Sequence, residues 1–260
     1  MKGYRLDARD GLIGKVKEFY FEDQHWAIRY LVADTGSWLT GRKVLISPGT
    51  LAGVNRDNRA IAVNLTKKKI EDSPSLDTDK PVSRHFEEGY NAYYVWPSPC
   101  LWGSYPGLMN PSMMGGGGPS TVPSNTASDP YDPHLRSTRD VSGHHVQATD
   151  GEIGHVEDFL IDDDSWTIRY LVIDTRNWWP GRRVLISPQW IDRISWTEAK
   201  IFANVAREWV RQSPEYIEQS VVTRDDEAEL YKHYKRTGYW RERLTAGQPL
   251  VVEGRDTTVF

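Results

Sequence analysis

Short apolar segments recur along the chain and predict a protein built from β-strands. The clearest is residues 26–33 (WAIRYLVA), in which both alternating faces are largely apolar, as expected for a buried central strand. Polar turn residues separate the segments: Asp10-Gly11 marks the first hairpin turn, and Asp57-Asn58 marks the last. In the first part of the chain the pattern predicts six strands, at residues 2–7, 16–21, 26–33, 44–47, 50–56 and 59–65.

The same pattern returns later in the chain without a gap. Residues 10–48 reappear as residues 150–188, a displacement of 150 − 10 = 140 positions, and 23 of the 39 aligned residues are identical. A repeat of this length indicates a duplicated domain. Gly14 and Gly154 occupy equivalent positions inside strand patterns, which predicts a bulge or a sharp bend. We therefore expect a mainly β protein with two tandem small β-barrels of six short strands each.

Helical segments follow each predicted barrel. Residues 66–72 and 206–212 predict one or two helical turns, and residues 84–94 and 224–236 carry aromatic side chains at helical spacing. A stretch rich in Pro, Gly, Ser and Met lies between the two copies and predicts a linker. The expected organisation is a first domain over residues 1–94, a linker over 95–138, a second domain over 139–240 and a tail over 241–260.

Charged residues in the central hairpin predict one ion pair in each copy. If the two strands pair end to end around the turn, antiparallel register places Glu18 opposite Arg29, and the second copy repeats this with Asp158 and Arg169. Such a cross-strand pair contributes roughly 0.2–1 kcal/mol to stability. We interpret these four residues as structural.

The net charge of −4 conceals a difference between the two copies. Residues 1–70 carry 13 Lys and Arg against 7 Asp and Glu, a net of +6, whereas residues 141–210 carry 7 against 11, a net of −4. Opposite charges could dock the two copies on each other, within a chain or between chains, or they could be drift of surface charge after duplication. A negative overall charge argues against nucleic acid as the partner.

The residues that could support catalysis or metal binding do not form a recognised site. The single cysteine, Cys100, lies in the predicted linker, and the sequence has no HExxH motif. We therefore expect no enzymatic activity, no cofactor and no metal. Three histidines fall in the first two strands of the second copy, where the first copy has other residues, so we interpret them as exposed strand residues: His144, His145 and His155. Three consecutive acidic residues lack the ligand spacing of a calcium loop and are interpreted as a solvated turn: Asp162, Asp163 and Asp164.

One loop in each copy combines tryptophan, glycine and arginine. Aromatic residues and arginine are enriched at binding hot spots, which makes these loops candidate partner-binding sites. Capping of the barrel by the tryptophans is the alternative interpretation. The candidate residues are Trp38 and Arg42 in the first copy, and Trp178, Trp179 and Arg182 in the second.

Three motifs resemble those of the PRC-barrel domain family. They are IRYLVxDT at residues 28–35 and 168–175, VLISP at 44–48 and 184–188, and DGxIGxVxDF, matched closely at 150–159 and less closely at 10–19. The resemblance covers both predicted barrels and their helical appendages, but neither the linker nor the tail. Such domains are known from the cytoplasmic part of the photosynthetic reaction-centre H subunit, from a ribosome maturation factor and from stand-alone bacterial proteins. In this family the barrel is a docking module, which implies interaction rather than catalysis.

The expected function is that of a non-enzymatic bacterial scaffold that binds a protein partner or a second copy of itself, in a stress-related or membrane-complex setting. A first alternative is an accessory subunit of a photosynthetic or electron-transfer membrane complex, with the acidic turn and the three histidines as proton carriers. A second is a ribosome- or RNA-associated factor acting through the basic first copy.

No apolar run approaches the roughly 20 residues of a membrane helix. The expected location is the cytoplasm, with a peripheral position at the inner membrane as the alternative.

Overall fold

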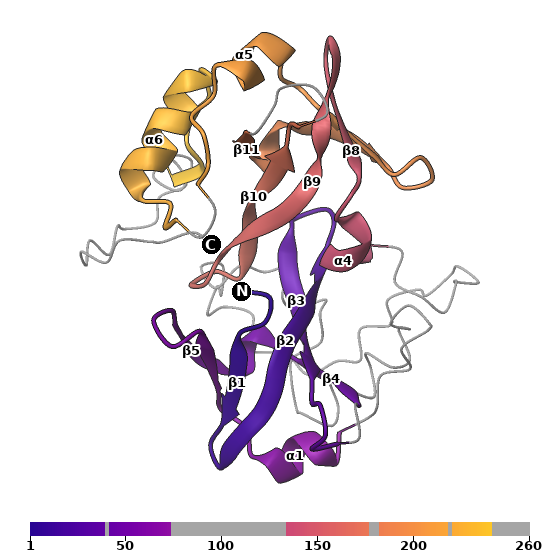
Figure 1. Ribbon diagram of the computed structural model, residues 1–260, viewed down its shortest axis with the longest axis vertical. Helices are drawn as coiled ribbons and strands as arrows, with labels where there is room; N and C mark the ends of the chain where they lie inside the picture. The colour runs from indigo at the N-terminus through magenta and orange to yellow at the C-terminus, as the bar shows by residue number, and fades with distance from the viewer. Residues whose placement is uncertain (40–41, 74–133, 177–181, 218–219, 241–260) are drawn as a thin grey trace, which may run out of the picture.

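The computed structural model describes residues 1–39, 42–73, 134–176, 182–217 and 220–240. Two β-rich modules, built from the two copies of the repeat, are stacked along the long axis of the molecule (Figure 1). Among the described residues, no helix is long and apolar enough to cross a membrane. The predicted helix at residues 84–94, the tail and nearly all of the predicted linker lie outside the described residues.

The elements of the two modules follow each other in the same order. The first module contains β1 (Arg5–Ala8), β2 (Gly11–Glu22), β3 (Ala27–Asp34), β4 (Lys43–Ile46), the 3-10 turn Pro48–Thr50, β5 (Leu51–Asn55), β6 (Ala60–Val63) and α1 (Lys67–Glu71). The second contains β8 (His145–Ala148), β9 (Gly151–Asp162), β10 (Thr167–Asp174), β11 (Arg183–Ile186), the 3-10 turn Pro188–Trp190, β12 (Ile191–Ser195), β13 (Lys200–Ala203), α5 (Arg207–Arg211) and α6 (Arg224–His233). The predicted mainly β fold is confirmed.

The strands form one continuous sheet. Its order is β12-β13-β8-β9-β10-β3-β2-β1-β6-β5, with β11 paired to β10 and β4 paired to β3. We expected each set of six strands to close into a barrel, but among the described residues the hydrogen bonding leaves the sheet open. Pro48 and Pro188 offer no backbone N–H and begin 3-10 turns between the fourth and fifth strands of each module. The chain therefore changes direction at these turns, and β4 does not pair with β5, nor β11 with β12, within the described residues.

A reciprocal strand contact joins the two modules. The Ile28 amide donates to the Trp166 carbonyl, and the Ile168 amide donates to the Trp26 carbonyl, each over 2.8 Å. Because these positions are related by the displacement of 140, the contact has the self-complementary form of a twofold interface within a single chain. We call this contact, where β3 meets β10, the seam.

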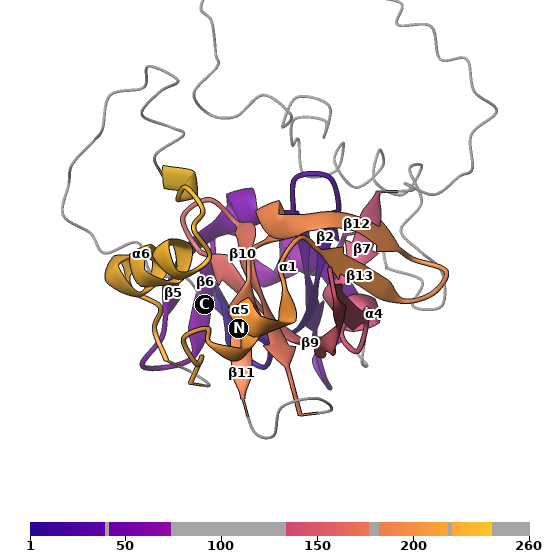
Figure 2. The same cartoon turned by 90° about the horizontal axis from the view of Figure 1, so that it is seen from above.

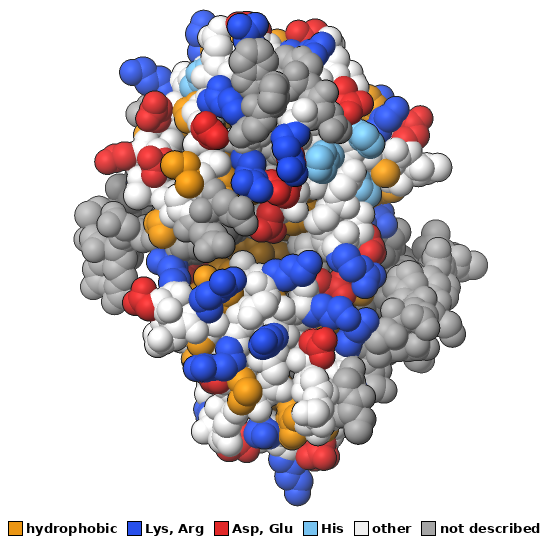
Figure 3. All heavy atoms as spheres, viewed as in Figure 1, with side chains coloured by type: hydrophobic (Ala, Val, Ile, Leu, Met, Phe, Trp, Pro, Cys, Tyr) orange, Lys and Arg blue, Asp and Glu red, His pale blue; other side chains and the backbone are white. Residues whose placement is uncertain are grey.

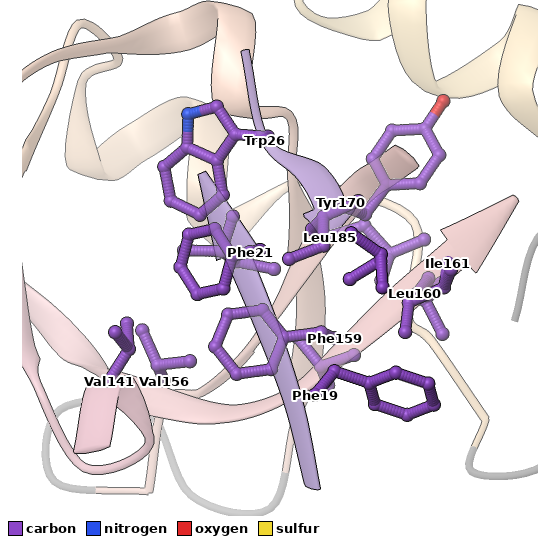
Figure 4. Packing of buried hydrophobic residues seen from close by; sticks show 14 of the residues in the cluster. Phe19, Phe21, Trp26, Val141, Val156, Phe159, Leu160, Ile161, Tyr170 and Leu185 are labelled. Atoms are coloured by element: carbon purple, nitrogen blue, oxygen red, sulfur yellow. The ribbon is translucent and has the colours of Figure 1, made fainter. Parts of the chain in front are cut away.

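The two modules share one apolar core across the seam. Phe21 stacks on Trp26 with ring centroids 5.2 Å apart, and its ring lies 6.1 Å from that of Phe159 in the second module (Figure 4). An ion pair of 3.0 Å joins Arg56 of the basic module to Asp163 of the acidic module. Docking of the two copies within the chain, one of the two interpretations of their charges, is therefore what the structure shows.

The segment between the modules adds a strand to the first one. Strand β7 (Leu135–Ser137) pairs antiparallel with β2, and the short helix α4 (Thr138–Val141) packs against the same strand. The Phe19 amide donates to the Thr138 hydroxyl over 3.1 Å, and the Ser137 hydroxyl donates to the buried Glu18 carboxylate. The chain is thus anchored on the first module before it builds the second.

The predicted ion pairs in the central hairpins are wrong. Glu18 lies opposite Val32, not Arg29, and Asp158 lies opposite Val172, not Arg169. The reason is that each hairpin contains two register shifts, which move the strands past each other relative to a regular ladder. Arg169 instead binds Asp162, with Nη2 and Oδ2 2.6 Å apart.

Helix α6 packs against the second module, and the buried carboxylate of its residue Glu227 forms hydrogen bonds there. Seen from above, α6 and the β12–β13 hairpin lie on opposite sides of this module (Figure 2). The side chain of Glu227 is fully buried and accepts hydrogen bonds from the Tyr170 hydroxyl (2.8 Å), the Tyr239 hydroxyl (2.9 Å) and Arg224 Nη1 (2.6 Å). Burial raises the pKa of Glu227, and the charge of Arg224 opposes this shift.

Candidate functional site

The arginines of the candidate loops stabilise short helices. Arg42 Nη1 donates to the Glu71 carbonyl over 2.8 Å, and Arg182 Nη1 donates to the Arg211 carbonyl over 2.9 Å. These carbonyls belong to the last residues of α1 and α5, where cations are favoured. Each arginine also donates to the serine carbonyl two residues further on. Their equivalence in the two copies is therefore explained by the fold.

The structure places the candidate tryptophans only in part. Trp38 is partly buried against the core, with the Lys67 ammonium 4.6 Å from the centre of its ring. Trp178 and Trp179 lie outside the described residues. Trp38 packs on the core of an open sheet rather than on a closed barrel, which favours a structural role for it, and the pair in the second module stays a prediction.

We expect Arg182→Ala to lower the free energy of unfolding by about 2 kcal/mol, because it leaves two carbonyls at the end of α5 without their charged donor. Arg182→Lys keeps the charge, but one ammonium cannot reproduce the two-pronged contact, so it should recover less than half of this loss. Urea unfolding of both variants measures the effect. Unchanged stability in Arg182→Ala would contradict a structural role.

The histidines of the second module have separate partners. His144 is buried with its ring 5.9 Å from that of Trp196, and burial lowers its pKa. His145 lies 3.0 Å from Glu152, and His155 lies 4.0 Å from Asp174. The expected exposure holds for His145 and in part for His155, but it is wrong for His144, which precedes β8 and packs against Trp196.

The acidic turn is neutralised from both sides of the seam. Burial would raise the pKa of Asp162, but the Arg169 guanidinium more than compensates, so the pKa is lowered. Asp163 pairs with Arg56 of the other module, and burial raises its pKa. These two carboxylates serve the seam and the hairpin. The expected solvated turn therefore holds for Asp164, which is exposed, but is wrong for Asp162, which is buried against Arg169.

One cluster of potential metal ligands is found in the described part of the chain. Glu22, Asp23 and His134 have ligand atoms within 4.8 Å of one another. The Asp23 carboxylate already accepts from Arg136 Nε at 3.0 Å and lies 3.0 Å from His134 Nδ1. We interpret the cluster as ion pairing that holds β7 on β2. Sequence reasoning missed it because His134 lies 111 residues from Asp23.

Directly paired residues form a row across the six strands of each module. Side chains at directly paired positions share one face of a sheet, so each row marks one surface. In the first module the row is Asn55, Ala60, Arg5, Lys15, Asp34 and Lys43. In the second it is Ser195, Lys200, His145, His155, Asp174 and Arg183, each 140 positions further on. We call the surface marked by the first row the outer face of the first module.

A groove of about 350 Å³ lies at one end of this outer face. Three of its lining residues are small: Gly53, Ala60 and Ala62. Arg5 and Asp7 line it from β1 and bind each other, with Arg5 Nη2 3.0 Å from an Asp7 oxygen. The remaining lining residues are Val54, Asn55 and Asn58. Its volume is within the range of small-ligand and peptide-anchor pockets.

The equivalent place in the second module is filled. Arg193 stands where the first module has Gly53, and its guanidinium carbon lies 3.5 Å from the centre of the Phe202 ring. Phe202 replaces Ala62, and Lys200 replaces Ala60. The groove was missed in the sequence, although the signal was there: small residues in one copy face large ones in the other.

Residues 134–205 match the family model of the PRC-barrel domain. This range contains every strand from β7 to β13. No curated protein matches the chain. The chain therefore carries a PRC-barrel domain over these residues. The sequence motifs implied such a domain in both copies, and the match covers the second copy and β7 but not the first copy.

Proposed function

We propose that the protein is a non-enzymatic interaction protein whose first module holds a protein partner on its outer face. The observation that carries this proposal is the groove between β1, β6 and β5, which is open in the first copy and filled by Phe202 and Arg193 in the second. The two copies thus differ at a surface that is accessible in the first and covered by side chains in the second, which suits a binding face in the first module. The second module then serves as a rigid support through the seam.

The position of the groove favours an extended protein segment as the occupant. Strand β5 is the end of the sheet, and among the described residues no strand pairs with its outer edge. A free edge beside a shallow groove can accept an added strand, with the backbone giving affinity and the groove accepting one side chain. Arg5 and Asp7 neutralise each other on the groove wall, which suits recognition better than proton transfer.

Substitution of Ala62 by phenylalanine should close the groove as Phe202 does in the second module. We expect Ala62→Phe to fold with nearly unchanged stability, because Ala62 is exposed, and to lose at least about 90% of the partner captured, since a blocked central pocket typically costs 2 kcal/mol or more. Quantitative affinity purification from the native host, comparing variant with wild type, measures the loss.

Ala52→Phe is the matched control, because Ala52 is an exposed residue of β5 that does not line the groove. It should retain the same partner. If Ala62→Phe captures the same proteins in the same amounts as Ala52→Phe, the groove is not the binding site.

The two alternative functions have weaker support. For the membrane-complex alternative, the proposed proton carriers have separate partners, with Asp162 held by Arg169 and His144 packed on Trp196. For the RNA alternative, many Lys and Arg side chains lie on the visible side of the first module (Figure 3). Capture that disappears on nuclease treatment, and that weakens steeply with salt, would favour RNA over a protein partner.

A further inference from the structure

A surface ion pair of the second module is replaced by two lysines in the first. Arg183 on β11 binds Glu157 on β9 through two contacts, one of them 2.7 Å between Nη2 and Oε1. The equivalent residues, 140 positions earlier, are Lys43 and Lys17. The first module has therefore kept the cation and exchanged the carboxylate for a second cation.

The two lysines stand at equivalent positions to an ion pair, and the described part of the chain supplies neither with a carboxylate counterion. Lys17 and Lys43 occupy the positions whose counterparts, Glu157 and Arg183, lie within hydrogen-bond distance of each other in the second module. Burial and the Lys17 ammonium lower the pKa of Lys43. Among the described residues, neither lysine has a carboxylate within salt-bridge distance. Two carboxylates lie near Lys43, and both have other partners. Glu18 is buried and bound by Ser137 and, at 3.6 Å, by Arg139. Asp34, opposite Lys43 on β3, accepts a hydrogen bond from the Gly36 amide.

Arg139 extends the same basic cluster. Its guanidinium is about half exposed and contributes to the lowered pKa of Lys43, although Asp140 and Glu18 partly neutralise it. Like charges placed together on a sheet destabilise it, so the cluster costs folding energy that an anion would return. The second module shows which anion fits between these strands, because a carboxylate occupies that position there.

We propose that Lys17 and Lys43 bind a carboxylate of the docked partner, in the position that Glu157 supplies internally in the second module. This inference rests on the proposed function and names the chemistry of the partner: an acidic protein segment. Lys43 and the groove residue Ala60 belong to one row of paired residues on the outer face, so a partner whose added strand lies at the edge of β5 can reach the lysines with a second part of its surface over the same face. The partner would place an uncharged portion at the groove and an acidic side chain at the lysines.

The test is a titration of the full chain with a hexaglutamate peptide, followed by NMR of backbone amides at low salt. Amide shifts should centre on Lys17 and Lys43, and hexaglutamine should produce none. Lys17→Glu recreates the ion pair of the second module, so it should weaken peptide binding at least about tenfold, as loss of a cation and gain of an anion at a contact imply. The same variant should raise the unfolding midpoint, which shows that lost binding does not reflect lost folding.

Lys68→Glu is the matched control, with the same charge change at an exposed position of α1. It should leave peptide binding within about twofold of wild type, since a remote exposed charge is largely screened. Equal weakening by both variants, or shifts that do not include Lys17 and Lys43, would overturn the proposal. Inorganic phosphate that binds more tightly than the peptide would also overturn it, in favour of a phosphate site.

The experiment separates this inference from the proposed function. Ala62→Phe closes the groove but should leave hexaglutamate binding unchanged, because the lysines are intact. If Ala62→Phe loses the partner while hexaglutamate never perturbs the lysines, the interaction role stands and the carboxylate site fails. If hexaglutamate binds at the lysines but Ala62→Phe retains every partner, the groove assignment fails instead.

Discussion

Gly154→Ala is expected to lower the free energy of unfolding by about 4 kcal/mol or more, enough to unfold much of a marginally stable protein. The φ angle of Gly154 is +137°, which side-chain-bearing residues rarely adopt. A methyl group there would overlap the backbone carbonyl oxygen of Asp174 and lie 3.1 Å from the Thr175 Cα atom. Both neighbours are backbone, so relief requires moving β10 away from β9.

Gly143→Ala provides the control for the effect of backbone conformation alone. Gly143 also has a positive φ, +90°, but a methyl group there meets no atom within 4 Å. We expect a loss of about 1 kcal/mol, typical of conformational strain without a clash. Urea denaturation of both variants gives the difference, and equal losses would contradict the close approach of β9 to β10 as the cause.

Glu227→Ala should lower the free energy of unfolding by about 3–5 kcal/mol, because it leaves Arg224 and two tyrosine hydroxyls without their shared acceptor. The hydroxyl of Tyr170 points away from the apolar cluster that surrounds its ring and donates to Glu227 (Figure 4). Glu229→Ala, at an exposed position of the same helix, should stay within about 0.5 kcal/mol of wild type. Thermal and urea unfolding distinguish the two.

The stability conferred by Glu227 should also depend on pH. Because its pKa in the folded protein is raised above the ordinary 4.5, folding favours the protonated form. Its contribution is therefore fully present below pH 4.5 and declines as pH rises through the raised value. Glu227→Gln cannot ionise, so its stability relative to wild type should improve over that pH range. A difference between the two proteins that does not change with pH would contradict the raised pKa.

The repeat made most of the fold predictable from sequence. Apolar periodicity located the strands, and the paired glycines Gly14 and Gly154 marked the bend at which β2 and β9 pass over a neighbouring strand. The register within the hairpins was not predictable, because the bulges that set it depend on backbone geometry rather than on residue type. For the same reason Glu18 was assigned to Arg29, when its partners come from residues more than 100 positions away.

The candidate site was harder to predict, because a shared motif marks the fold and not the function. Arg42 and Arg182 stood out by being repeated, and the structure gives them a repeated structural role. The groove and the lysine pair are visible only as differences between the copies, at Ala62 against Phe202 and at Lys17 against Glu157. The pairing register of all six strands was needed to see which residue differences between the copies lie on the same face of the sheet.

The reciprocal hydrogen bonds at the seam make the two modules interchangeable partners. Two chains could exchange modules and rebuild the same seam, with Ile28 and Trp166 contributed by different molecules. The balance between a closed monomer and an exchanged dimer is then governed by the effective concentration that the tether between the modules imposes. A change in the length of that tether would shift the protein between monomer and dimer, while the contacts within its folded modules stay the same.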